Sequence, residues 1–155
     1  MNLFDELPEA DARPGYASRE RRFGDELDAT LWGGTAYELG PGERVCPYHW
    51  HFGDEEWLLV VSGAPTLRTP EGEARLRPWD VAVFVRGETG AHEVRNDTDS
   101  TVRVAIFSTV SDPEVCVYPD SDKVGVFAGW SRRDGQQLHL MNRPDENLDY
   151  FDREK

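Results

Sequence analysis

Three of the chain's four histidines and a nearby carboxylate stand at spacings that suit a metal site. His49 and His51 lie two residues apart in the stretch PGERVCPYHWHFGDEEWLLVVSG (41–63), and Glu55 and Glu56 follow them. On a β-strand, side chains two apart leave the same face, so both imidazoles can aim at one point. Imidazole and carboxylate donors from different strands suit a divalent first-row metal and leave positions open for water or substrate.

His92 is the third histidine of this set, and it opens a second strand-like segment, AHEVRN, after a glycine-containing turn. A single histidine is more often a solvated or core residue than a ligand. Three histidines in two matching strand contexts, with a carboxylate one turn away, favour a metal site. We therefore predict four ligands: His49, His51, Glu56 and His92. Glu55 is expected to face outward or cap the turn, although the reverse assignment of the two acids stays open.

The composition predicts one soluble domain. A chain of 155 residues is long enough for a single domain with a real core. Its net charge of −13 would repel phosphate backbones and anionic lipid headgroups, which argues against nucleic-acid and membrane partners. The chain start lacks the features of a signal peptide, and the best apolar runs, WLLVV and VAVFV, are far too short to cross a bilayer. We expect a cytoplasmic protein in which Cys46 and Cys116 stay reduced.

Short apolar runs alternate with turn signals through most of the chain. The runs TAYEL, EWLLVV, PTLRT, ARLR, DVAVFV, HEVR and TVRVAIFSTV are rich in β-branched and aromatic residues, and Gly- or Pro-containing turns separate many of them. Many short strands at this spacing predict an all-β fold, an antiparallel sandwich or barrel. The polar residues 1–28 are expected to form an irregular arm with at most one helical turn.

The barrel is assigned to residues 29–128 and a C-terminal tail to residues 129–155. The tail is acidic, but Leu148, Tyr150 and Phe151 are expected to pack it on the barrel. Proline and aspartate in the stretch YPDSDK predict a turn before the tail.

The run EWLLVV is apolar on both of its faces. If Glu56 points inward, Trp57, Leu59 and Val61 lie on the opposite face, and something must cover them. Either the N-terminal arm packs there or a second copy of the chain does. We predict a homodimer, with ordinary packing within the chain as the alternative.

Residues 41–63 resemble the first motif of the cupin superfamily, in which a glycine precedes HxH, a glutamate follows, and a glycine closes the hairpin. The stretch DVAVFVRGETGAHEVRN resembles the second motif, with Gly87, His92 and Asn96 in place. The likeness covers about residues 35–110, and YPDSDK extends it to small bacterial single-domain cupins. The chain departs from the pattern at Trp79 and Arg86, where glycine and proline are usual, and its turn from Gly87 to His92 is two residues longer.

The resemblance implies a jelly-roll β-barrel that holds one Zn, Fe, Mn, Ni or Cu ion through three histidines and one glutamate. Those roles map onto His49, His51, Glu56 and His92. Two functions follow from it: a small-molecule metalloenzyme (an isomerase, lyase or oxygenase) or a non-catalytic module that binds or senses a ligand. Motifs of serine hydrolases, P-loops and dinucleotide-binding folds are absent from the sequence. Cys46 lies three residues before His49, which on a strand would point it to the other face, and Pro47 interrupts the run, so we expect a buried or turn thiol there.

Overall fold

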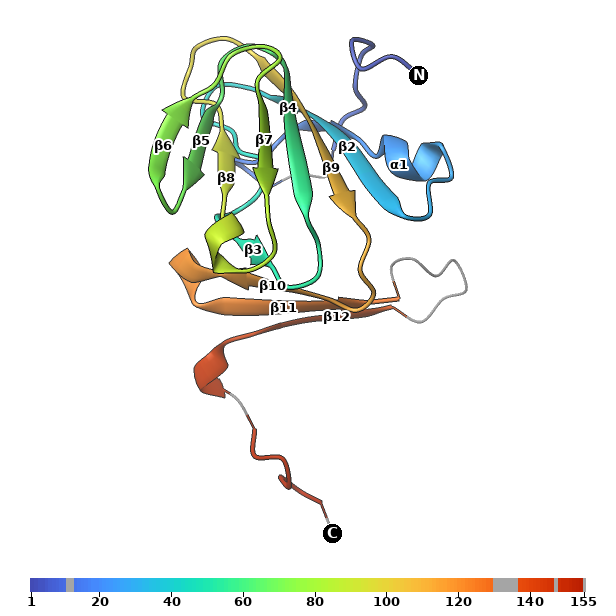
Figure 1. Cartoon of the computed structure of the whole chain (residues 1–155), viewed down its shortest axis with the longest axis vertical. Helices are drawn as coiled ribbons and strands as arrows, with labels where there is room; N and C mark the ends of the chain where they lie inside the picture. The colour runs from blue at the N-terminus through green and yellow to red at the C-terminus, as the bar shows by residue number, and fades with distance from the viewer. Residues whose placement is uncertain (11–12, 130–136, 147, 155) are drawn as a thin grey trace.

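The protein is an all-β molecule in which every paired strand runs antiparallel to its neighbour, as a jelly roll requires (Figure 1). This is a computed structural model that describes residues 1–10, 13–129, 137–146 and 148–154. Its strands form three sheets, which the described residues do not close into one continuous hydrogen-bonded barrel. The predicted all-β, antiparallel jelly-roll fold is confirmed. None of the described helices is long and apolar enough to span a membrane.

The largest sheet has five strands in the order β1-β2-β9-β4-β7. Their bounds are β1 Arg19–Arg21, β2 Trp32–Leu39, β9 Val102–Thr109, β4 Glu56–Ser62 and β7 Val81–Phe84. The two longest strands, β2 and β9, pair along their whole length, and β4 pairs with both β9 and β7.

The two smaller sheets have the orders β6-β5-β8 and β12-β11-β10-β3. Figure 1 shows the strands β10, β11 and β12 running across the lower ends of β4, β7 and β9. Their bounds are β6 Gly72–Arg75, β5 Thr66–Thr69, β8 Glu93–Arg95, β12 Leu138–Asn142, β11 Lys123–Ala128, β10 Glu114–Tyr118 and β3 Trp50–His51.

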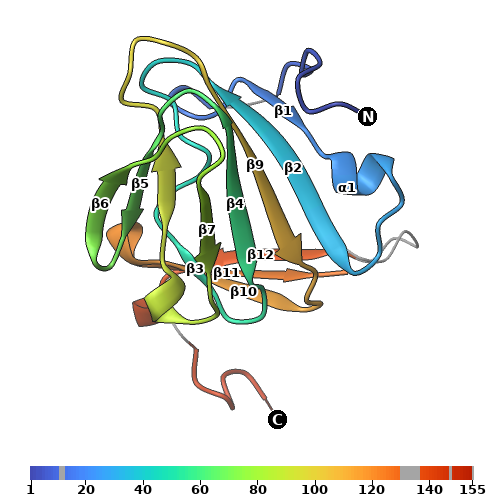
Figure 2. The same cartoon turned by 45° about the horizontal axis from the view of Figure 1, so that its top comes forward.

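Helical structure is confined to short segments. They are α1 Phe23–Glu26 and the 3-10 turns η1 Glu88–Gly90, η2 Pro119–Ser121 and η3 Pro144–Glu146. Figure 2 shows α1 beside β2, at the open edge of the large sheet. Each of the seven apolar runs singled out in the sequence contains residues of one strand. The runs therefore correctly located strand β2 and the six strands from β4 to β9.

Strand β4 has two apolar faces because each packs on a different layer. Leu58 is fully buried in the interior cluster with Leu39 and Val104. On the opposite face, Leu59 and Val61 belong to a second cluster, which includes Leu7 and Phe23 of the arm, residues 1–28. The arm therefore covers part of the outer face, as one of the two sequence alternatives stated.

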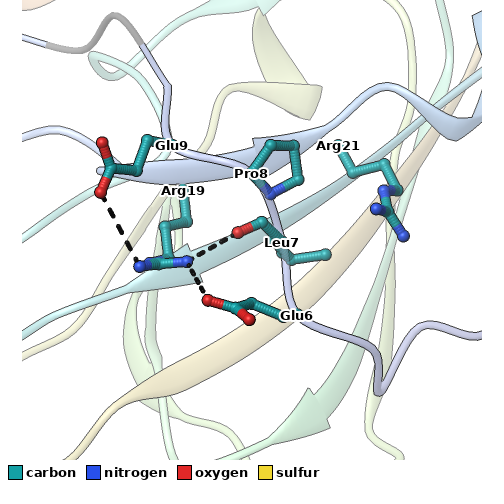
Figure 3. A pocket seen from close by; sticks show the side chains of 6 residues that line it. All are labelled: Glu6, Leu7, Pro8, Glu9, Arg19 and Arg21. Atoms are coloured by element: carbon teal, nitrogen blue, oxygen red, sulfur yellow. Dashed lines mark hydrogen bonds and ion pairs between the residues drawn. The ribbon is translucent and has the colours of Figure 1, made fainter.

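The arm is held to the sheet by polar contacts as well. Arg103 donates to the backbone carbonyls of Leu3 and Asp5, both at 2.9 Å. Figure 3 shows Arg19 reaching Glu6, at 3.0 Å, and the carbonyl of Leu7, at 2.8 Å, beside an open surface pocket. These bonds replace the solvation of backbone groups that the arm would otherwise expose.

Two parts of the surface remain apolar and uncovered in the single chain. On the outer face, Trp57 and Val83 are 42% and 43% exposed and lie opposite each other on β4 and β7. In the tail, β12 pairs with β11, whereas Leu148, Tyr150 and Phe151 are 71–88% exposed. Figure 1 shows the chain running away from the body after β12. The domain boundaries stay a prediction, and residues 11–12, 130–136, 147 and 155 of the expected arm and tail lie outside the described residues.

Replacing Leu7 by Ala should lower the free energy of unfolding by about 2–5 kcal/mol, because it empties a site where the side chain is 1% exposed. Leu31→Ala, which removes a side chain that is 75% exposed, should change it by less than about 0.5 kcal/mol. Urea denaturation followed by tryptophan fluorescence measures both. If the two variants unfold at the same midpoint, the arm is not part of the cooperative core.

Candidate metal centre

The four predicted ligands come from three separate strand ends that the fold brings together. His49 precedes β3 and His51 ends it, Glu56 opens β4, and His92 precedes β8. Reciprocal backbone hydrogen bonds join His49 and His92: each amide donates to the other's carbonyl, at 3.1 and 2.9 Å. This antiparallel bridge fixes the distance between the two segments that sequence alone could not place.

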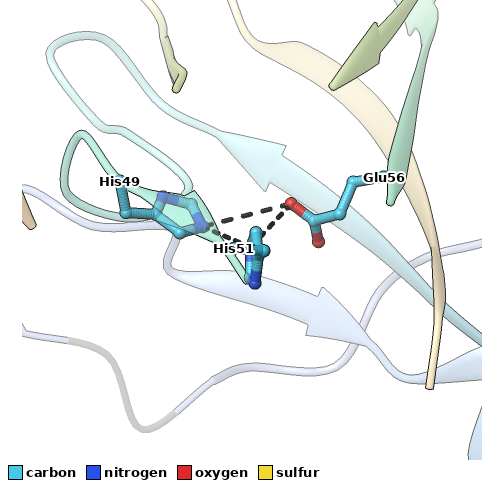
Figure 4. A group of neighbouring side chains, drawn as sticks. All are labelled: His49, His51 and Glu56. Atoms are coloured by element: carbon cyan, nitrogen blue, oxygen red, sulfur yellow. Dashed lines mark hydrogen bonds and ion pairs between the residues drawn. The ribbon is translucent and has the colours of Figure 1, made fainter. Parts of the chain in front are cut away.

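The ligand atoms of His49, His51 and Glu56 lie within 4.8 Å of one another, and His92 joins this group through its contact with Glu56. The Nε2 atoms of His49 and His51 are 2.9 Å apart, and Glu56 Oε2 lies 3.2 Å from His51 Nε2 and 4.0 Å from His49 Nε2 (Figure 4). The Nε2 atom of His92 is 3.1 Å from the same carboxylate oxygen. Two donors bound at about 2.1 Å and at right angles around one ion stand about 3 Å apart, so these spacings suit a shared ion.

The second acid of the pair points elsewhere. Glu55 accepts a hydrogen bond from the Trp57 indole at 3.2 Å, and its own amide donates to Thr109. The structure therefore brings Glu56, and not Glu55, to the histidines. His139, the fourth histidine, lies on β12 with its ring next to Phe127.

Backbone carbonyls define the tautomers of two histidines. The Nδ1 atom of His49 lies 2.9 Å from the Pro47 carbonyl, and that of His92 lies 3.0 Å from the Gly90 carbonyl. A carbonyl can only accept, so each Nδ1 carries the hydrogen and each Nε2 presents a lone pair to the centre. Phe84 stacks on the His92 ring, with centroids 3.6 Å apart, and holds it in place.

His92 Nε2 is fully buried and has no hydrogen-bond partner among the described residues. A lone pair that faces a carboxylate oxygen at 3.1 Å is repelled by it unless a cation lies between them. The orphaned nitrogen and the donor set of three imidazoles and one carboxylate thus fit a divalent first-row metal ion. Metal ligation by the four residues stays a prediction.

The electrostatics of the centre place one proton on His51. Burial lowers its pKa, but hydrogen bonds to Cys116, Glu114 and Glu56 outweigh burial and raise it to about 12. Burial and the neighbouring His92 and His51 lower the pKa of His49 to about 3. For Glu56, burial raises the pKa, but the hydrogen bond from His51 and further bonds outweigh it and hold the pKa well below its ordinary value. At neutral pH His51 therefore holds an extra proton, whereas His49 does not.

Two residues at the centre were not identified from the sequence. Glu114 Oε1 and Cys116 Sγ lie 3.3 and 3.2 Å from His51 Nδ1, on the side of the ring away from Glu56. They stand two apart on β10, the same spacing that singled out His49 and His51, but no histidine marked that segment. Only the pairing of β10 with β3 brings them to the centre.

Cys46 is a half-buried free thiol in the segment before β3, as expected of a buried or turn thiol. Its Sγ lies 3.5 Å from His49 Nδ1, so it does not point to the opposite face as it would on a regular strand. Strand alternation does not apply there, because β3 begins only at Trp50 and Pro47 interrupts the extended run before it. Burial raises the pKa of the Cys46 thiol well above its ordinary value, so it stays protonated.

Comparison with known proteins agrees with this architecture. The family model for the cupin domain, Cupin_2, matches residues 36–110. No curated protein matches the chain in sequence. Among solved structures, a provisionally assigned sugar phosphate isomerase from Acidithiobacillus ferrooxidans has a TM-score of 0.70 at 25% identity, over 83% of this chain and 78% of that one.

Two further structures resemble the chain in fold. A cupin-superfamily sugar phosphate isomerase from Silicibacter pomeroyi has a TM-score of 0.76 at 24% identity and covers 95% of this chain and 93% of its own. The polyketide cyclase RemF from Streptomyces resistomycificus has a TM-score of 0.56 at 22% identity, over 68% of this chain and 75% of that one. The first of these likenesses extends over nearly the whole of both chains.

Metal binding should tighten about tenfold per pH unit across the neutral range, because an ion must displace the proton that His51 holds. The pKa of His51 in the folded protein, about 12, lies above the ordinary histidine value of 6.5. His51 therefore keeps its proton at neutral pH, where a free histidine has lost it. Calorimetric titration with Zn²⁺ in buffers of different ionisation enthalpy should give about one proton released per ion. Affinity that stops rising with pH just above neutrality would contradict the assignment, since it would indicate a histidine of ordinary pKa.

Proposed function

Because the chain belongs to the cupin superfamily, we propose that it is a metal-dependent enzyme acting on a small molecule. The observation that carries the proposal is the convergence of His49, His51 and Glu56 inside the fold, with His92 Nε2 next to the Glu56 carboxylate. The proposed ion is one divalent Zn, Fe, Mn, Ni or Cu. The three neutral imidazoles and one carboxylate that would bind the ion carry a total charge of −1. An ion that accepts more than four ligands would keep positions open for water or substrate.

We propose that the reaction is the isomerisation of a phosphorylated sugar. Support comes from two solved structures that cover 83% and 95% of this chain, both described as sugar phosphate isomerases. When bound, the ion would act as a Lewis acid that polarises the oxygen atoms of the substrate. The chain's own contribution is a buried, pre-positioned set of donors: His49 and His92 are held by their backbone partners and need not reorganise.

The edge of the centre offers a hydrogen-bonding group as well. The Tyr118 ring stacks on His49, with centroids 5.7 Å apart and an interplanar angle of 20°. Burial, together with the nearby Cys116 and Cys46, raises the pKa of its phenol, so Tyr118 keeps its proton at neutral pH. It can hold the His49 ring in place and donate a hydrogen bond, but it is not ionised to act as a base.

Replacing His49 or His51 by Ala should reduce bound metal from about one equivalent to a small fraction and abolish isomerisation of aldose and ketose phosphates. His139→Ala is the matched control, since it removes the remaining histidine on an exposed strand and should keep both properties. Elemental analysis of protein purified without a tag or chelator measures the metal. A full equivalent retained by His49→Ala and His51→Ala would refute the site. Metal binding without turnover of any sugar phosphate would favour the non-catalytic, ligand-sensing alternative.

We also propose that two copies of the chain pair in the cytoplasm through the exposed part of the outer face. Trp57, Val81 and Val83 are 42%, 57% and 43% exposed on adjacent strands, beside the part that the arm covers. A contiguous apolar surface of this kind is typical of subunit interfaces. The two free thiols suit a reducing compartment.

Val83→Glu should therefore convert a dimer into a monomer without unfolding it, because a charge would be buried at the interface. Leu148→Glu adds the same charge to a side chain that is 74% exposed in the tail and should leave the dimer intact. Sedimentation equilibrium measures the mass. A wild-type chain that sediments as a monomer at all concentrations would contradict the proposal.

A further inference from the structure

His51 differs from the other two histidines in the group that faces its Nδ1 atom. His49 and His92 each meet a backbone carbonyl, whereas His51 meets the carboxylate of Glu114 at 3.3 Å. Glu114 opens β10, outside the residues 36–110 that the family model matches. The carboxylate thus lies beyond the matched range, and its place at His51 needs an explanation of its own.

Glu114 is placed for an interaction with the centre and not with solvent. The residue is 7% exposed, and its Oε2 is fully buried with no hydrogen-bond partner among the described residues. Its Oε1 accepts from the amide of Gly53 at 3.3 Å. A β-carbon at Gly53 would lie 2.3 Å from Oε2, so only glycine leaves room for the carboxylate here. Such a buried carboxylate is costly unless a positive or strongly donating group faces it.

Two carboxylates compete for the hydrogen atoms of one imidazole. Glu56 lies 3.2 Å from Nε2 of His51, and Glu114 lies 3.3 Å from Nδ1. When His51 is neutral, its imidazole carries one hydrogen. A hydrogen on Nε2 would bond to Glu56, and neither His51 Nε2 nor Glu56 could then bind an ion. If the hydrogen resides on Nδ1, both Nε2 and Glu56 are free to bind an ion.

We propose that Glu114 is a positioning residue that holds the His51 hydrogen on Nδ1 and so turns Nε2 and Glu56 toward the metal ion. The proposal rests on the metal site described under Proposed function. A carboxylate behind a ligating imidazole also makes the bound nitrogen a stronger donor. The charges agree: the carboxylates of Glu56 and Glu114 together balance a divalent ion when His51 is neutral.

Cys116 is the other group at His51 Nδ1, with Sγ at 3.2 Å. A neutral thiol is a weak acceptor, so it competes poorly with a carboxylate for the imidazole hydrogen. Cys116 and Glu114 could instead bind a second ion together with His51 Nδ1, since the three donor atoms lie within 4.8 Å of one another. That arrangement would require His51 to lose both hydrogens, and metal stoichiometry distinguishes it from the positioning role.

The test compares Zn²⁺ affinity in Glu114→Gln with that of the wild-type chain. The amide keeps the size of the side chain but removes its charge, so the dissociation constant should rise about 10- to 100-fold. Cys116→Ala should change it much less. Glu93→Gln is the control for a buried carboxylate, because Glu93 is 4% exposed and pairs with Arg44 away from the centre. It should weaken folding without changing Zn²⁺ affinity.

A second readout does not depend on affinity. In the Zn²⁺-loaded wild-type protein, the imidazole N–H proton of His51 should appear at low field in the proton NMR spectrum, as a hydrogen bonded to a carboxylate does. It should move upfield in Glu114→Gln while the corresponding protons of His49 and His92 stay in place. A purely structural role for Glu114 would not produce that selective shift.

Three results would overturn the proposal, and each has a different meaning. Equal Zn²⁺ affinity and an unmoved N–H resonance in Glu114→Gln would refute the positioning role while leaving the metal site intact. Two equivalents of Zn²⁺ in the wild-type chain, falling to one in both Glu114→Gln and Cys116→Ala, would assign Glu114 to a second ion. A wild-type chain that binds no Zn²⁺, Mn²⁺, Fe²⁺, Ni²⁺ or Cu²⁺ would refute the metal site and the positioning role together.

Discussion

The repulsion among four electron-rich atoms is the constraint on which the rest of the structure depends. The Nε2 atoms of His49, His51 and His92 each lie 3.1–4.0 Å from Glu56 Oε2 in a buried setting, and those of His49 and His51 are 2.9 Å apart. Left to themselves, such groups would separate or take up protons. The fold holds them together through bonds that lie outside the cluster: the reciprocal pairing of His49 with His92, and the carbonyls of Pro47 and Gly90. A cation bound among them would relieve the repulsion.

The layers of the fold serve this arrangement. Strand β4 delivers Glu56 to the interior, and its next inward side chains, Leu58 and Val60, are fully buried. Its outward side chains would expose a second apolar stripe, and the arm covers part of it with Leu7 and Phe23. The sheet that contains β3 and β10 supplies the groups behind the His51 ring. Buried apolar side chains thus surround a small polar centre, in which electrostatic interactions are stronger than in water.

Much of this could be predicted from the sequence because it is local. The spacing of His49 and His51, the carboxylate after one turn, and the period-two patterning of β4 and β9 all depend on neighbours in the chain. His92 was included because it opens a second strand-like segment, and the family resemblance added the jelly-roll topology. Glu56 was preferred to Glu55 with the reverse assignment left open, and the hydrogen bond that Glu55 accepts from Trp57 favours Glu56.

The parts that could not be predicted depend on contacts between distant segments. Glu114 and Cys116 reach His51 only through the pairing of β10 with β3, about 60 residues apart in sequence, and nothing local distinguishes them from other strand residues. The contact of Cys46 with His49 could not be predicted because Pro47 breaks the regular strand geometry that would have fixed the direction of the thiol. In the tail, the pairing of β12 with β11 and the exposure of Leu148, Tyr150 and Phe151 likewise depend on contacts that aromatic composition does not specify.

The most direct test of the account is anomalous X-ray diffraction from crystals of protein purified without a tag or chelator, collected at the absorption edge of the metal found by elemental analysis. The account predicts one strong peak that lies about 2.0–2.2 Å from Nε2 of His49, His51 and His92 and from Oε2 of Glu56. A peak at any other place, or none after the crystals are soaked in Zn²⁺ or Mn²⁺, would contradict it.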